Sequence, residues 1–229
     1  MHSDTEIAVT RAASKYDCTV PVAVFDLDGT LTVRDAVVPF LIEAGGRKRL
    51  VCRTPGQIGA FAKLWVKRDR DGAKLIATRA MLTGVERESV GKAAMTIAAR
   101  ITRGWMRDDV LARLRWHQES GHHTIIVSAS YSEYVRLVGD ALGVDHVIAS
   151  ELEFDESGIC TGGLRGGNCR GQEKADRLTA YLESSFNSTA VDWCYGDSSG
   201  DDEMLALATN AIRVHGIDLD AAPEGSVGA

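Results

Sequence analysis

Short apolar runs rich in β-branched residues alternate along most of the chain with segments of helical periodicity. The apolar runs predict buried strands at 20–25, 124–127, 146–149, 192–195 and 211–214. Helical spacing predicts helices at 109–119, 133–142, 172–182 and 201–208. This alternation predicts an α/β fold, in which a doubly wound, mostly parallel, Rossmann-like sheet carries helices on both faces.

The stretch between the first two strands departs from this alternation. Asp35 stands at the N-cap position of a helix, and apolar residues then keep helical spacing to about residue 103 without any strand signal. We therefore predict that residues 36–103 form a small helical cap. This cap is inserted into an α/β core made of residues 19–35 and 104–216.

Three further segments have their own signatures. Residues 1–18 are polar and lack periodicity, which predicts a flexible N-terminal extension. Residues 217–229 are rich in Gly, Ala and Asp, which predicts a disordered tail. The apolar segments 151–154 and 159–164 flank an Asp-Glu-Ser-Gly turn and predict a β-hairpin.

The composition and charge of the chain limit the kinds of binding partner that we expect. The formal net charge is −6, so the chain has no general attraction for nucleic acid or for an anionic membrane. No apolar run approaches the roughly 20 residues needed to span a bilayer, so no stable membrane insertion is expected. The five cysteines are odd in number and form no Cys-x-x-Cys pair, and the N-terminus has no apolar signal segment. These features predict a cytoplasmic protein with free thiols and leave its oligomeric state open.

Polar residues follow three of the predicted strands, where ligands bind in open parallel sheets. They are Asp26 with Asp28, Ser128, and Asp197, and Lys174 opens a predicted helix. These groups suit phosphoryl transfer. A carboxylate can attack phosphorus, but two anions approach only if Mg²⁺ and a lysine neutralise them.

Each group has a predicted role. Asp26 is the nucleophile and shares Mg²⁺ with Asp197, while Asp28 acts as general acid and then as general base. Ser128 and the N–H groups after it hold the phosphoryl oxygens, and Lys174 supplies positive charge. Gly29 removes a side chain where the backbone must turn sharply.

At these positions the sequence resembles the haloacid dehalogenase superfamily in its phosphatase form. Four ordered motifs carry the resemblance between about Val20 and Val214: Asp26-Leu27-Asp28-Gly29-Thr30, Ile125-Ile126-Val127-Ser128, Lys174, and Gly196-Asp197-Ser198-Ser199-Gly200-Asp201. The resemblance implies an aspartyl-phosphate intermediate and a metal site made of Asp26, Asp28, Asp197 and Asp201. An aspartate at position 28 implies a phosphatase, because dehalogenases of this superfamily lack an acid there.

The position of the helical insert and the segment 168–174 resemble the phosphoserine-phosphatase-like branch, subfamily IB. This resemblance adds Gly29 and Ala129 as substrate-binding residues and gives two cap residues possible roles. Asp35 either caps its helix or contacts a substrate amino group, and Arg79 lies either on the helix surface or at a substrate carboxylate. Tyr131 either shapes the leaving-group pocket or packs.

The predicted reaction is magnesium-dependent hydrolysis of a small polar phosphorylated metabolite, phosphoserine-like or a polyol or sugar phosphate. Three alternatives stay open. The first is a lipid-phosphate phosphatase of the phosphatidylglycerophosphate type, and the second is a phosphotransferase that uses an acceptor other than water. The third is a non-catalytic phosphate-binding protein, which would be expected to lack at least one of the side chains that phosphoryl transfer requires.

Overall fold

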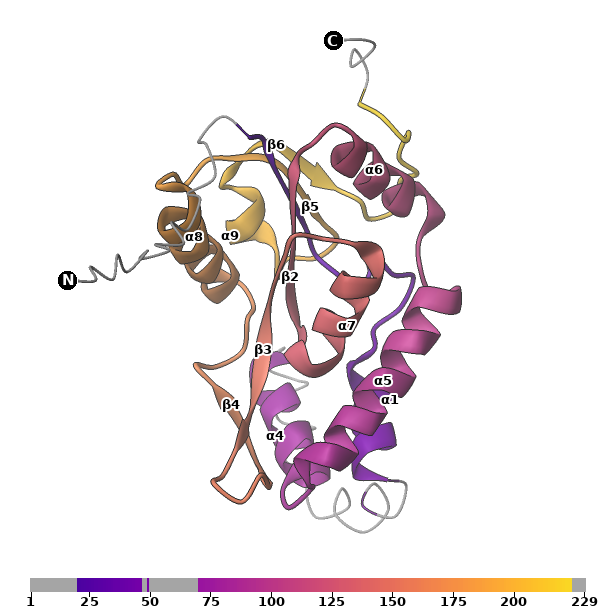
Figure 1. Cartoon of the computed structure of the whole chain (residues 1–229), viewed down its shortest axis with the longest axis vertical. Helices are drawn as coiled ribbons and strands as arrows, with labels where there is room; N and C mark the ends of the chain where they lie inside the picture. The colour runs from indigo at the N-terminus through magenta and orange to yellow at the C-terminus, as the bar shows by residue number, and fades with distance from the viewer. Residues whose placement is uncertain (1–19, 47–48, 50–69, 224–229) are drawn as a thin grey trace, which may run out of the picture.

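The chain folds around one six-stranded sheet. A computed structural model describes residues 20–46, 49 and 70–223, and its sheet has the order β4-β3-β2-β1-β5-β6 (Figure 1). The strands are β1 (Val22–Phe25), β2 (His123–Tyr131), β3 (His146–Phe154), β4 (Cys160–Arg165), β5 (Val191–Gly196) and β6 (Ala208–Arg213). All neighbouring pairs are parallel except β3 with the edge strand β4. The predicted mostly parallel sheet and its hairpin are thus confirmed.

Helices cover both faces of this sheet. They are α1 (Val37–Gly45), α4 (Arg70–Leu82), α5 (Arg87–Gly104), α6 (Asp108–Glu119), α7 (Ser132–Leu142), α8 (Gln172–Phe186) and α9 (Asp202–Leu205). The alternation of side chains along β1 divides the interior into two cores. Ala23 and Phe25 face the core shared with α6 and α7, whereas Val22 and Val24 face the core of α8 and α9. This arrangement confirms the predicted doubly wound sheet.

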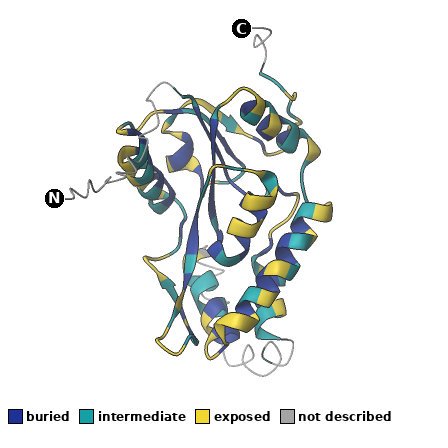
Figure 2. Cartoon of the chain, viewed as in Figure 1, coloured by how far each residue is buried: buried dark blue, intermediate teal, exposed yellow. Residues whose placement is uncertain are grey.

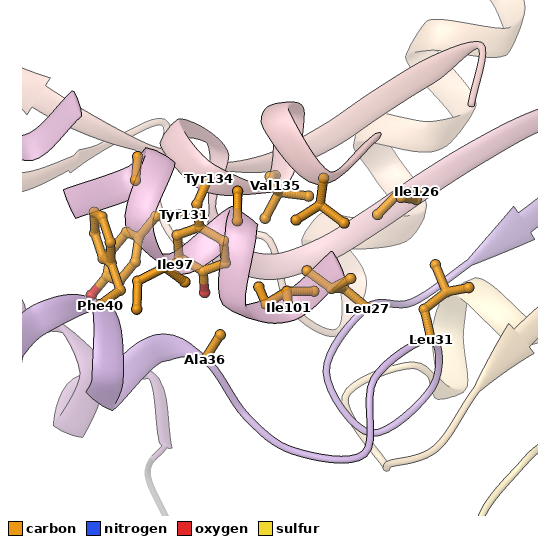
Figure 3. Packing of buried hydrophobic residues seen from close by; sticks show 14 of the residues in the cluster. Leu27, Leu31, Ala36, Phe40, Ile97, Ile101, Ile126, Tyr131, Tyr134 and Val135 are labelled. Carbon is orange, nitrogen blue, oxygen red and sulfur yellow. The ribbon is translucent and has the colours of Figure 1, made fainter. Parts of the chain in front are cut away.

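The helices of the insert share the first of these two cores. Phe40 of α1 and Ile101 of α5 belong to the same buried cluster as Tyr134 and Val135 of α7 (Figure 3). Both α5 and α7 carry buried and exposed residues in Figure 2, and their buried hydrophobic residues belong to this shared cluster. The insert is therefore fixed to the sheet domain by apolar burial. Residues 47–48 and 50–69 of the predicted cap lie outside the described residues.

The two chain segments that connect the insert to the sheet are hydrogen-bonded to each other. The N–H of Val33 donates to the carbonyl of Trp105 at 2.8 Å, and the N–H of Arg107 donates to the carbonyl of Leu31 at 2.9 Å. Thr32 lies between them and forms an isolated antiparallel bridge with Met106. We call residues 31–33 and 105–107 the paired linkers.

Several element boundaries differ from the prediction. β2 continues beyond Val127 to Tyr131, and β3 runs without a break from His146 into the predicted hairpin. The register of β2 against β3 shifts between Ser128 and Tyr131, an irregularity that hydrophobic periodicity does not reveal. α9 is a single short turn, because the chain enters β6 already at Ala208.

Part of the C-terminal segment lies against α6. Arg107 donates to the carbonyl of Ile217 at 2.7 Å, and Asp109 accepts the N–H of Leu219 at 3.0 Å. Residues 224–229 and the predicted extension 1–18 lie outside the described residues. Among the helices of the described part of the chain, none has the length and apolarity to cross a membrane.

A buried histidine lies in this part of the core. His117 on α6 is fully buried, with Nε2 2.9 Å from the hydroxyl of Tyr195 and Nδ1 2.8 Å from Nδ1 of His122. Burial, together with the neighbouring His122 and Arg113, lowers the pKa of His117 to about 3. The folded protein therefore holds this imidazole neutral at a pH where the unfolded chain protonates it.

We predict that the free energy of unfolding falls as the pH drops from about 6.5 toward 4. In this range the unfolded state binds a proton that the folded His117 does not, which costs about 1.4 kcal/mol of stability per pH unit. His117→Gln should remove that part of the slope, measured by urea unfolding at pH 7, 6 and 5. The exposed His215→Gln is the matched control. An unchanged slope in His117→Gln contradicts the assignment.

Candidate active site

A buried lysine joins the ends of three elements. Lys174, in the first turn of α8, donates to Oδ1 of Asp26 and to Oδ1 of Asp201, both at 2.5 Å. Asp26 directly follows β1, and Asp201 directly precedes α9. All three side chains are buried, so their charges interact in a region of low dielectric constant.

A third carboxylate completes what we call the acidic group, Asp26, Asp197 and Asp201. Asp197 follows β5, which pairs with β1, and each of the three offers an oxygen within 4.8 Å of the others. Gly29 makes room for this arrangement. Its φ is +87°, and a Cβ there would lie only 2.4 Å from Oδ2 of Asp197.

The electrostatics of the acidic group favour a bound cation. Burial raises the pKa of Asp26 to about 6, although Lys174 opposes the shift. Burial and then the charge of Asp201 also raise the pKa of Asp197. Burial alone would lower the pKa of Lys174. The two carboxylates that Lys174 contacts outweigh this effect and raise its pKa above the usual range. Three converging carboxylate oxygens that one ammonium does not fully neutralise fit Mg²⁺, which prefers hard oxygen ligands.

Asp28 is held separately. Its Oδ1 accepts the N–H of Ala36 at 2.9 Å, and its Oδ2 accepts the hydroxyl of Ser130. Burial, and then the charge of Asp35, raises the pKa of Asp28 to about 7. A carboxyl group with this pKa can release and accept a proton near neutral pH. The carboxylate of Asp28 is not part of the acidic group, in contrast to its predicted place among the metal ligands.

The end of β2 supplies the next groups. Ser128 is buried, and its Oγ accepts the N–H of Ser130 at 3.0 Å. The carbonyl of Ala129 accepts the hydroxyl of Ser150 at 3.0 Å. These bonds fix the backbone of the irregular segment between Ser128 and Tyr131, so that Ser128 and Ala129 both face the cavity over Asp26.

A cavity of about 320 Å³ lies over these groups. It brings together all the residues predicted for the site except one: Asp26, Asp28, Gly29, Asp35, Ser128, Ala129, Lys174, Asp197 and Asp201. Its described lining also includes residues that the sequence did not single out for the site: Val37, Asp71, Lys74, Ser130, Asn168, Arg170, Ser198 and Gly200. The predicted residue that does not line it is Arg79.

Arg79 lies elsewhere on α4. Its side chain is exposed, and a Cβ on Gly162 of β4 would lie 3.3 Å from its Cγ. Arg79 therefore packs beside the hairpin, and the described structure gives it no contact with the cavity. The reason is helical geometry: Lys74, five residues earlier, occupies the face of α4 that turns toward the cavity.

Lys74 connects the insert to the sheet at the cavity wall. Its Nζ donates to the carbonyl of Ala129 and to Oδ1 of Asn168 at 2.6 Å, and it lies 4.5 Å from the centre of the Tyr131 ring. Burial lowers the pKa of Lys74 to about 8. The phenol of Tyr131 is itself held by Thr78 at 2.6 Å. Tyr131 therefore packs under the lysine and shapes this wall.

Asp35 supports the start of α1 from one residue before the N-cap, not from the N-cap position predicted for it, and its contact with a substrate amino group stays a prediction. It lies before Ala36, the N-cap residue of α1, and its Oδ1 accepts the N–H of Val37 at 2.6 Å. It also lines the cavity. Asp35 thus fixes the first turn of α1 while its charge remains at the cavity, close enough to raise the pKa of Asp28.

Known proteins resemble this chain in sequence. The model of the haloacid dehalogenase-like hydrolase family matches residues 23–206. The protein CicA of Caulobacter vibrioides is 36% identical over 186 residues, which cover 80% of this chain and 81% of CicA. The chain belongs to the haloacid dehalogenase-like hydrolase family, as its four motifs predicted.

Solved structures show the same fold. A protein of unknown function from Bordetella pertussis Tohama I aligns with a TM-score of 0.66 and 20% identity, covering 82% of this chain and 86% of its own. Phosphoserine phosphatase in its apo form aligns with a TM-score of 0.57 and 17% identity, covering 82% and 83%. The predicted resemblance to the phosphoserine phosphatase branch is thus confirmed at the level of the fold.

We predict that Gly29→Ala weakens Mg²⁺ binding by about tenfold or more, because a methyl group at this position displaces the carboxylate of Asp197. Calorimetric titration of the purified protein with Mg²⁺ measures this without any substrate. The added methyl group also strains the backbone at positive φ, which lowers the stability of the folded protein by about 1 kcal/mol.

Gly84→Ala is the matched control for that strain. Gly84 has a φ of +78°, but no heavy atom lies within 4 Å of a Cβ placed there. The control should lose a similar amount of stability and bind Mg²⁺ like the unaltered protein. Equal Mg²⁺ affinity in Gly29→Ala and Gly84→Ala would show that the contact with Asp197 is irrelevant to the metal site.

Proposed function

We propose that this protein is a magnesium-dependent phosphomonoester hydrolase that acts through an aspartyl-phosphate on Asp26. The observation that carries the proposal is the buried contact of Lys174 with Asp26 and Asp201, at the floor of a cavity that Asp28 also lines. A nucleophile, a positive charge and a separate proton donor are thus available to one substrate. No group that this chemistry needs is missing, which disfavours a purely phosphate-binding protein.

The first step forms a bond between a carboxylate oxygen of Asp26 and phosphorus and breaks the bond to the leaving oxygen. Lys174 balances the negative charge of nucleophile and phosphoryl group, and the hydroxyl of Ser128 binds a phosphoryl oxygen. Asp28 gives its proton to the leaving oxygen. Its raised pKa, due first to burial, keeps that proton available near neutral pH.

The second step breaks the bond between phosphorus and the Asp26 oxygen, so that phosphate is released and Asp26 returns to its carboxylate form. A water molecule attacks the phosphorus of the aspartyl-phosphate, and the Asp28 carboxylate takes up its proton. Ser130 and the N–H of Ala36 hold Asp28 in one orientation for both steps. One residue thereby serves as acid and then as base without a change of position.

The acidic group would hold the metal, with Asp26 and Asp197 as the ligands expected from the sequence and Asp201 bound also to Lys174. Mg²⁺ bound there supplies positive charge that offsets the repulsion between the carboxylates and an anionic substrate. Gly29 permits the close approach of Asp197 on which this group depends.

The cavity wall favours a small polar leaving group. Above the floor, Asp35, Asp71, Lys74 and Asn168 place both signs of charge and an amide around the space next to Asp28. Val37 is the one large apolar side chain in the described lining. A polar wall of this kind suits an amino-, hydroxyl- or carboxyl-bearing alcohol better than a lipid chain.

We predict that Asp26→Asn lowers phosphate release by about a thousandfold or more, because an amide cannot replace the attacking carboxylate. The assay is a screen of phosphoserine, sugar phosphates, polyol phosphates and phosphatidylglycerophosphate in the presence of Mg²⁺. Added alcohols as competing acceptors show whether water is the natural acceptor.

Asp140→Asn, on the exposed side of α7, is the matched control and should keep full activity. Circular dichroism confirms that both variants are folded. The proposal fails if Asp26→Asn retains substantial turnover, or if the unaltered enzyme remains active after EDTA removes divalent metal.

We predict that Lys74→Met raises KM by roughly ten- to hundredfold for small polar substrates, the effect of losing one charged hydrogen bond, and changes kcat much less. Arg79→Met, on the same helix but away from the cavity, should leave both constants near their original values. Steady-state kinetics on the best substrate of the screen measures both variants. A larger effect of Arg79→Met than of Lys74→Met contradicts this assignment of the cavity wall.

A further inference from the structure

The described lining of the cavity contains three cationic side chains, and two of them donate to partners within the protein. Lys174 donates to Asp26 and Asp201, and Lys74 donates to the Ala129 carbonyl and to Asn168. The third, Arg170, has neither an ion pair nor a side-chain hydrogen bond to any residue in the described ranges. Each lysine ammonium uses two of its three donors on these partners, whereas none of the side-chain donors of Arg170 has a partner within the described ranges.

The position of Arg170 is fixed by the loop that precedes α8. The N–H of Arg170 donates to the carbonyl of Asn168 at 2.8 Å, and the N–H of Gly171 donates to the carbonyl of Gly200 at 2.9 Å. Gly200 lies next to Asp201 of the acidic group. The loop that bears Arg170 is thus tied by its backbone to the loop that bears two of the three carboxylates.

The guanidinium itself packs against Gly200. A Cβ on Gly200 would lie 2.8 Å from Nε and 3.1 Å from Cζ of Arg170, so only a glycine leaves the arginine in this place. The side chain is half-buried at the cavity edge, on the side of the acidic group. Arg170 nevertheless forms no ion pair with Asp197 or Asp201, and the planar donors of its side chain have no partner among the described residues.

We propose that Arg170 binds the non-bridging oxygens of the phosphoryl group while it is transferred to and from Asp26. This inference rests on the proposed function. During transfer, charge accumulates on the three equatorial phosphoryl oxygens, and a guanidinium matches two of them with parallel hydrogen bonds. Lys174 uses two of its three donors on carboxylates of the same site, so it can offer one more at most, whereas Arg170 can offer a parallel pair.

The direct test is the binding of inorganic phosphate, the product that lacks any leaving group. In the presence of Mg²⁺, Arg170→Met should weaken phosphate binding by about tenfold to a hundredfold, the effect of losing a charged hydrogen bond. Arg170→Lys keeps the charge but loses the paired hydrogen bonds, so its affinity for phosphate should lie between that of the unaltered protein and that of Arg170→Met. The exposed Arg165→Met, on β4, is the matched control and should bind phosphate normally.

A double-mutant cycle tests the contact with Gly200. Gly200→Ala should displace the arginine and reproduce much of the loss, and it should add little when Arg170 is already Met. The backbone of Gly200 is not at positive φ, so alanine is compatible with the loop conformation. Full additivity of the two changes would show that Gly200 acts independently of Arg170 and would overturn this part of the inference.

Two substrates separate the phosphoryl group from the leaving group as the ligand of Arg170. For p-nitrophenyl phosphate and p-carboxyphenyl phosphate, Arg170→Met should lower kcat/KM by the same factor. A loss confined to the carboxylated substrate, with phosphate affinity unchanged, overturns the inference and leaves the phosphatase intact. If the unaltered protein hydrolyses no phosphomonoester, the proposed function fails instead.

Discussion

The arrangement of the site depends on one ammonium group buried between two carboxylates. Lys174 contacts Asp26 and Asp201 in a region from which water is excluded, and removing one member of such a buried set costs about 3–5 kcal/mol. Without the lysine, two like charges would face each other across a few ångströms. The same contact ties together β1, α8 and the loop after β5, so the charge balance of the site and the docking of these elements are one constraint.

Close packing of carboxylates imposes a second constraint, on the residues around them. Gly29 leaves room for Asp197, and Gly196 leaves room for Asp201. A Cβ placed on Gly196 would lie only 2.7 Å from the Cβ of Asp201. Both glycines stand in motifs recognised from the sequence. Their physical role is to let backbone segments approach one another until three carboxylates converge. Negative charge is thereby concentrated at this end of the sheet, where Lys174 offsets part of it.

The floor of the site could be predicted from the sequence because it follows from the sheet. Polar residues that end neighbouring parallel strands must meet at one edge, and Asp26, Ser128 and Asp197 do so. The walls could not be predicted in this way. Lys74 meets Ala129 and Asn168 across 55 and 94 positions of the chain, and no local pattern distinguishes it from a surface lysine. The two interpretations of Arg79, on the helix surface or at a substrate carboxylate, stayed open in the sequence because the spacing of residues along α4 does not say which face of the helix meets the sheet.

The paired linkers have a consequence for how this chain tolerates change. The insert leaves the sheet and returns to it at one point, where residues 31–33 and 105–107 are joined by backbone hydrogen bonds. The intervening segment is topologically a loop whose ends are already closed, and the entropy of such a loop depends only weakly on its length. A change of length between α1 and α5 that keeps their buried faces in place therefore leaves the paired linkers and the strands beside them unaltered. The length of the insert can thus vary while β1 and β2, which carry Asp26 and Ser128 to the cavity, keep their register.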